Sequence, residues 1–68
     1  MNEMYKNINY WYHYYLIKMS QREGQALFNA IYKMDTEYGN EIRGSELDSF
    51  YDDSRCDKLW EIIYKKYN

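Results

Sequence analysis

Residues 20–34, with the sequence SQREGQALFNAIYKM, carry the clearest helix signal in this chain. Ser20 and Glu23 have the spacing of a capping box, in which the serine hydroxyl accepts a hydrogen bond from the N3 amide and the glutamate reaches back to the N–H of the cap. The apolar residues that follow recur at helical spacing: Leu27, Ala30, Ile31 and Met34. The stretch therefore predicts a helix that begins after Ser20 and ends near Met34.

The segment before this helix, from about Glu3 to Met19, fits two kinds of secondary structure. A helical stripe is formed by Met4, Ile8, Trp11, Tyr12, Tyr15, Leu16 and Met19. With a period of two, every second residue from Ile8 to Leu16 shares one face instead, and Ile, Tyr and Trp favour strands. The helical pattern extends over the longer window, so we predict a helix here, with a strand over residues 8–17 as the alternative.

The next stretch predicts a short helix and then a loop. Asp35 or Thr36 can cap a helix that ends near Ile42. Gly44 suits the left-handed conformation that closes such a helix. The loop that follows, over residues 45–53, is expected to turn two apolar side chains inward, Leu47 and Phe50.

The last segment predicts a third long helix, which starts at Asp53 or Ser54. Ser54 and Asp57 have the spacing of a weaker capping box. The apolar stripe of this helix consists of Cys56, Leu59, Trp60, Ile63 and Tyr67. Residues 1–68 therefore predict a single all-α domain, a small bundle of three longer helices and one short helix.

The chain is rich in aromatic residues for its length. It has ten Tyr, two Trp and two Phe among 68 residues. Each such side chain buries about 150–250 Å², and a domain this short buries only about 60% of its unfolded surface. Some rings are therefore expected on the surface, and Tyr and Trp are enriched at interfaces. The aromatic candidates for partner binding are Tyr10, Trp11, Tyr14 and Tyr51.

Charge is divided unevenly along the chain. Residues 35–57 carry eight acidic and two basic side chains, for a formal −6, whereas the other residues carry seven basic and three acidic side chains, for +4. Five of these acids are the candidate contacts with a basic partner: Glu41, Glu46, Asp48, Asp52 and Asp53. Asp53 is also a candidate helix cap, as are Asp35 and Asp57. The remaining candidates, Glu41, Glu46, Asp48 and Asp52, are the acids for which folding offers the least explanation.

The sequence lacks the residue combinations of a catalytic or metal site. Cys56 is the only cysteine and His13 the only histidine, so we expect neither an intrachain disulfide nor a Cys/His zinc site. No spacing supplies either residue with an oriented catalytic partner. Asp48, Asp52 and Asp53 do not match the ligand spacing of a calcium loop. We expect no enzymatic activity, no metal and no cofactor.

The sequence also indicates where the protein acts. No secretory signal peptide is recognisable in residues 1–6. The apolar run over residues 8–17 is too short to cross a bilayer. A single free cysteine fits a reducing compartment. We expect a cytoplasmic protein that does not enter a membrane.

Three binding hypotheses follow from the aromatic and charge patterns. Carboxylates spaced along a helix and a loop can imitate the phosphates of a nucleic acid and speed the encounter with a basic groove on another protein. Alternatively, the Tyr-rich first helix, with Lys6, Lys18 and Arg22, stacks on nucleic-acid bases, although the chain lacks the basic stripe usual for that function. The third hypothesis is a homo-oligomer in which the tyrosines form the self-interface.

Residues 40–55, with the sequence NEIRGSELDSFYDDSR, resemble a segment of small orphan proteins encoded by phages and prophages. The resemblance covers about a quarter of the chain and assigns no residue a role. It implies an activity of the kind found among phage accessory proteins, many of which block host defence nucleases or host polymerases. On this basis we expect an inhibitor of a nucleic-acid-handling protein in the bacterial host cell, such as an anti-CRISPR or anti-restriction protein.

Overall fold

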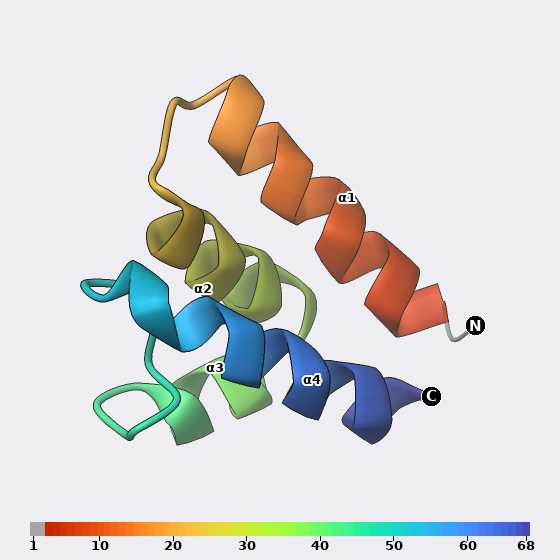
Figure 1. The fold of residues 1–68 in the computed structure, drawn as a ribbon. Helices are drawn as coiled ribbons and strands as arrows, with labels where there is room; N and C mark the ends of the chain where they lie inside the picture. Colours follow the sequence, from red (N-terminus) through yellow and green to blue (C-terminus); the bar gives the residue numbers. More distant parts are fainter. Residues whose placement is uncertain (1–2) are drawn as a thin grey trace.

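Four α-helices and one short 3-10 turn form the fold of residues 3–68, the part of the chain that the computed structural model describes. In chain order they are α1 (Glu3–Ile17), α2 (Glu23–Met34), α3 (Thr36–Ile42), η1 (Asp53–Arg55) and α4 (Cys56–Tyr67) (Figure 1). Residues 3–68 contain no strand. The predicted all-α bundle is therefore confirmed, and the alternative of a strand over residues 8–17 is wrong.

Helix α2 lies at the centre of the bundle. It contacts α1, α3, η1 and α4, and in Figure 1 α1 and α3 lie on different sides of it. The side chains at the centre of the core are fully buried and come from α1, α2 and α4: Ile8, Leu27, Ile31, Leu59 and Ile63. Within α2 and α4 they recur four residues apart, and this spacing keeps them on one face of a helix.

Aromatic rings join the first helix to the last. Tyr5 and Tyr12 both meet the Trp60 ring of α4 edge-on, with centroids 5.9 and 5.1 Å away. Edge-to-face pairs of this kind contribute about 0.5–1.5 kcal/mol each beyond the area they bury. Some of the many aromatic side chains therefore pack between the helices of the bundle.

The start of α2 differs from the prediction. The helix begins at Glu23, and its N-cap is Arg22, whose side chain makes no capping hydrogen bond. Ser20 lies outside the helix with a φ of 53°, so the capping box predicted from Ser20 and Glu23 is wrong. The N–H of Gly24 is bound instead by the carboxylate of Asp53. Local spacing cannot reveal a cap that arrives from another part of the chain.

Helix α3 begins and ends as predicted. Asp35 Oδ1 accepts a hydrogen bond from the N–H of Tyr38 at 3.0 Å, and Gly44 has the left-handed φ of 75°. Asp35 Oδ2 accepts a second hydrogen bond from the hydroxyl of Tyr67 at 2.6 Å, which ties α3 to the end of α4. The Tyr67 hydroxyl and, after it, the Tyr38 N–H lower the pKa of Asp35.

The approach to α4 also differs from the prediction. The 3-10 turn η1 comes first, and Asp52 caps it by accepting from the N–H of Ser54 at 3.0 Å. The N-cap of α4 itself is Arg55, with no side-chain cap. The capping roles predicted for Ser54 and Asp57 are therefore wrong, because the turn places the helix start at Cys56.

Candidate functional site

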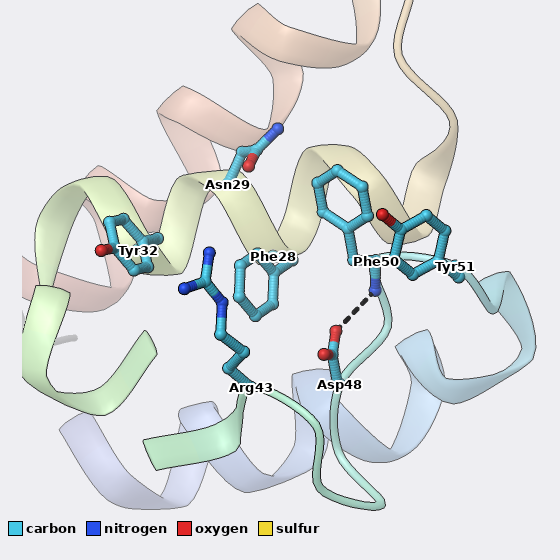
Figure 2. Close-up of a pocket in the computed structure, with 7 residues that line it drawn as sticks. All are labelled: Phe28, Asn29, Tyr32, Arg43, Asp48, Phe50 and Tyr51. Atoms are coloured by element: carbon cyan, nitrogen blue, oxygen red, sulfur yellow. Dashed lines mark hydrogen bonds between the residues drawn. The ribbon is translucent and has the colours of Figure 1, made fainter. Parts of the chain in front are cut away.

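Residues 43–52, which we call the 43–52 loop, connect α3 to η1 and are held by their own side chains. Both oxygens of the Asp48 carboxylate accept backbone hydrogen bonds, from Gly44 at 2.8 Å and from Phe50 at 3.0 Å (Figure 2 draws the second). Ser45 Oγ donates to the Ile42 carbonyl at 2.6 Å. These bonds satisfy polar backbone groups that no helix supplies with partners.

Arg55 fastens the loop from the side of η1. Its Nη1 donates to the carbonyl oxygens of Ser45 and Asp48 at 3.0 and 3.2 Å, and its Nε lies 3.2 Å from Asp52 Oδ2. Asp52 also accepts from Ser54, and the hydrogen bonds from Ser54 are the main reason that the pKa of Asp52 is lowered. One guanidinium thus joins both halves of the loop.

The end of the loop is bound to the start of α2. Asp53 Oδ1 accepts from Gly24 N–H at 2.9 Å and from Arg22 Nη1 at 2.8 Å. Arg22 Nη2 donates to the Phe50 carbonyl at 2.6 Å, and the fully buried Ser49 donates its hydroxyl to the Gly24 carbonyl at 2.8 Å. A Cβ at position 24 would overlap the Ser49 carbonyl oxygen. Gly24 is therefore the residue that lets the loop approach the helix.

This fixed loop presents an aromatic side chain to solvent. Tyr51 is 86% exposed, the most exposed of the large hydrophobic residues in 3–68. Its ring meets the neighbouring Phe50 ring edge-on, at a centroid distance of 4.7 Å. Phe50 and Leu47 pack against the core as predicted. The loop therefore packs the Phe50 ring against the core and leaves the Tyr51 ring exposed to solvent.

A pocket of about 360 Å³ opens beside Tyr51 (Figure 2). Seven residues from α2 and the 43–52 loop line it: Phe28, Asn29, Tyr32, Arg43, Asp48, Phe50 and Tyr51. The guanidinium of Arg43 lies over the Tyr32 ring, 5.6 Å from its centroid. Reasoning from the sequence did not find this pocket, because two segments that are separated in the chain, α2 and the 43–52 loop, form it together. The available signal was the presence of two basic residues in the acidic stretch, Arg43 and Arg55, of which Arg43 lines the pocket.

The predicted acidic contacts divide into two groups. Asp48, Asp52 and Asp53 bind groups within the domain, so the hypothesis that folding leaves Asp48 and Asp52 unexplained is wrong. Glu41 and Glu46 are exposed, and within residues 3–68 neither forms a hydrogen bond or an ion pair. These two glutamates are the acids of the predicted set that are free to meet a partner.

The predicted aromatic contacts lie on two surfaces. Tyr10 and Tyr14 lie on α1 and are 62% and 38% exposed, whereas Tyr51 lies in the 43–52 loop. Trp11 is half-buried, and the Lys33 ammonium covers its ring at 4.5 Å. Tyr10 and Tyr14 line a shallow, mostly apolar hollow of about 300 Å³ together with His13, Ile17 and Lys18. We call this surface the α1 outer face.

Two side chains with potential reactivity, Cys56 and His13, have surroundings that do not favour catalysis. Cys56 is buried, and burial, followed by nearby acids, raises the pKa of its thiol to about 11. His13 is exposed and meets the Tyr12 ring edge-on at 5.0 Å. Among residues 3–68, no three His, Cys, Asp or Glu side chains are grouped so that they can hold a metal ion.

Known proteins add nothing to this description. No family model, no curated protein and no solved structure matches the chain. None of the helices formed by residues 3–68 has both the length and the apolar character needed to cross a membrane.

Proposed function

We propose that this protein binds a basic surface of a nucleic-acid-handling protein through Tyr51 of the 43–52 loop, together with the exposed carboxylates of Glu41 and Glu46. The observation that carries the proposal is Tyr51, which is 86% exposed although hydrogen bonds fix the loop on both sides of it. A binding loop that is already ordered loses less conformational entropy on association. Exposed tyrosines on such loops are typical anchors of protein interfaces.

The free carboxylates supply the complementary charge. Glu41 and Glu46 are exposed at the end of α3 and at the start of the loop. Negative groups on a binding surface accelerate the encounter with a Lys- and Arg-lined groove and disfavour partners of like charge. Bound there, the loop would cover the surface that the nucleic acid otherwise occupies. Inhibition is therefore steric and electrostatic.

The biological setting that we propose is a phage or other mobile element in a bacterial cell. The resemblance of residues 40–55 to phage-encoded orphan proteins favours it. The target of first choice is a defence nuclease, which makes the protein anti-CRISPR-like or anti-restriction-like in action.

The charge contribution is tested by capture from a bacterial lysate on the immobilised full chain. A nucleic-acid-handling protein should be retained, should elute earlier as salt rises, and should be displaced by the polyanion heparin. A double variant, Glu41→Gln with Glu46→Gln, should weaken retention. The control, Glu3→Gln with Glu61→Gln, removes two exposed carboxylates from α1 and α4, of which Glu61 pairs with Lys65 at the surface. Retention should be unchanged by this control. Equal retention by both double variants would overturn the proposal.

The α1 outer face supports a second candidate function, self-association. Tyr10 and Ile17 are 62% and 69% exposed on a mostly apolar surface. Apolar patches that are rimmed by polar groups mark interaction sites. Sedimentation velocity over a dilution series should show a dimer that Ile17→Gln dissociates. A strict monomer at every concentration would exclude this function, and a salt-sensitive gel shift with DNA or RNA would favour nucleic-acid binding by the same helix.

A further inference from the structure

The three arginines of the chain are used in two different ways. Arg22 and Arg55 each pair with a carboxylate, Asp53 and Asp52 respectively, and each also donates to a backbone carbonyl. Arg43 does neither: within residues 3–68 its guanidinium pairs with no carboxylate and donates no hydrogen bond. Within the same residues, the guanidinium lies over the face of the Tyr32 ring. An arginine has five N–H donors, so this side chain is available to an anion from outside.

The guanidinium of Arg43, which is unpaired within residues 3–68, lies at the wall of an aromatic pocket. Figure 2 shows its side chain rising from the end of α3 toward the rings of Phe28 and Tyr32, on the wall of the 360 Å³ hollow. Phe50 and Tyr51 complete the aromatic lining. Ligand pockets have volumes of roughly 300–1,000 Å³. The hollow therefore has room for one aromatic ring and a small polar group.

Contacts within the domain hold much of the pocket wall in place. Phe28 is 4% exposed and belongs to the core. Phe50 is fixed by Asp48 at its N–H and by Arg22 at its carbonyl. The backbone N–H of Arg43 donates to the Gly39 carbonyl at 3.1 Å, which ends α3 at a defined place. Pre-formed walls lower the entropy cost of binding.

The charges in the pocket distinguish between possible ligands. Asp48 also lines the hollow, but both of its oxygens accept backbone hydrogen bonds. Aromatic rings attract cations, yet the Arg43 guanidinium already holds the Tyr32 face and would repel a second positive charge. The charged group of the pocket that has no partner among residues 3–68 is thus the cationic one, and an anion complements it.

We propose that this pocket binds an aromatic carboxylate. The ring of the ligand packs among Phe28, Phe50 and Tyr51, and its carboxylate accepts hydrogen bonds from Arg43 in the two-pronged geometry that guanidinium and carboxylate share. A free aromatic acid and the C-terminal aromatic residue of a partner chain offer this same chemistry. The inference does not rest on the proposed function: Tyr51 serves both, but the pocket depends on the positive charge of Arg43, whereas the proposed function depends on the negative charges of Glu41 and Glu46.

The test is a titration of the isotope-labelled full chain, followed by NMR at the Arg43 Nε–H and at the amides of Phe28 and Phe50. Three probes share one ring and differ in charge: phenylacetate, phenylacetamide and phenethylammonium. Phenylacetate should saturate these signals in the millimolar range expected for so small a ligand. The neutral amide should bind at least about fivefold more weakly, since it lacks the charge-assisted bonds. Equal binding of the amide, or tighter binding of the ammonium, would overturn the proposal.

Variants separate the role of Arg43 from general charge effects. Arg43→Gln should weaken phenylacetate binding to the level of the amide, with the amide signals of α1 and α4 unmoved as evidence of folding. Lys58→Gln removes one exposed positive charge from α4, which contributes no residue to the pocket, and should bind like the parent. Unchanged binding by Arg43→Gln would refute the assignment of the anion site.

A last comparison identifies the source of the ligand. The peptide Gly-Ser-Gly-Phe with a free C-terminus should compete with phenylacetate, and its C-terminal amide should not. If the free peptide binds more tightly than phenylacetate, the natural ligand is a chain terminus. If the peptide binds no more tightly than phenylacetate, the natural ligand is a free acid. Both results support the proposal, whereas failure of both the peptide and phenylacetate to bind contradicts it.

Discussion

The carboxylate of Asp53 accepts a hydrogen bond from the backbone N–H of Gly24 at 2.9 Å, although 29 residues separate the two in the chain. The free N–H groups at the start of a helix need acceptors, and here the acceptor comes from the turn that follows the 43–52 loop. The bond caps α2 and also fixes the end of the loop that presents Tyr51. Stability and the presentation of the candidate surface therefore depend on the same contact.

Asp53→Ala should destabilise the protein by about 1–3 kcal/mol, because it removes a helix cap and leaves Arg22 without its carboxylate partner. Urea unfolding at neutral pH measures the change. Glu46→Ala is the control, since Glu46 is exposed and forms no hydrogen bond or ion pair within residues 3–68; it should stay within about 0.5 kcal/mol of the parent. Equal effects of the two substitutions would show that the cap contributes nothing.

Gly24→Ala should also destabilise, by about 1–3 kcal/mol, because the new methyl group overlaps the Ser49 carbonyl oxygen, a backbone atom that cannot rotate away. Helix propensity alone predicts the opposite, a gain of about 1 kcal/mol. The neighbouring change Gln25→Ala, also in the first turns of α2, serves as control and should be neutral or slightly stabilising. A stabilised Gly24→Ala would mean that the loop does not approach the helix this closely.

The hydrogen bond between Tyr67 and Asp35 should make stability depend on acid pH. The pKa of Asp35 is lowered in the folded protein, chiefly by the Tyr67 hydroxyl, so its contribution is present above the ordinary aspartate pKa. It is lost as the pH falls through the lowered folded value. Tyr67→Phe should reduce the difference in unfolding free energy between neutral pH and pH values near 3. Tyr64→Phe, at an exposed tyrosine of the same helix, should not; identical acid profiles for both variants would contradict the assignment.

The thiol of Cys56 should react slowly in the folded protein. Burial is the main cause that raises its pKa to about 11, and the thiolate is the reactive form. Alkylation by iodoacetamide at neutral pH should therefore be slow in buffer and fast in denaturing urea. A native rate equal to that of the unfolded chain would show an accessible thiolate at this position.

The helices were predictable because their information is local. Ile8, Leu27, Ile31, Leu59 and Ile63 follow helical spacing, and each is fully buried. Asp35 caps α3 from a position adjacent to it, and Gly44 takes its left-handed conformation next to the helix it ends. Such signals depend on neighbours in the chain, so sequence spacing is enough to find them.

The candidate surfaces were predictable only in part, because they depend on distant residues. The sequence cannot show that Asp53 caps α2 and not its own helix, or that Asp48 turns both oxygens toward the backbone of its loop. It also does not separate Tyr51 from Tyr10, which the fold places on different elements. The exposure of Glu41 and Glu46 fits the acidic-contact hypothesis, which stays a prediction.

The most direct measurement of the central claim is the affinity of the captured nucleic-acid-handling protein for a Tyr51→Ala variant, compared with Tyr64→Ala. Both side chains are exposed tyrosines, at 86% and 44%, but only Tyr51 belongs to the 43–52 loop. Loss of an aromatic anchor typically costs about 2 kcal/mol or more, so Tyr51→Ala should bind about 30-fold more weakly, while Tyr64→Ala binds like the parent. Equal affinities of the two variants and the parent would contradict the claim that the loop is the binding surface.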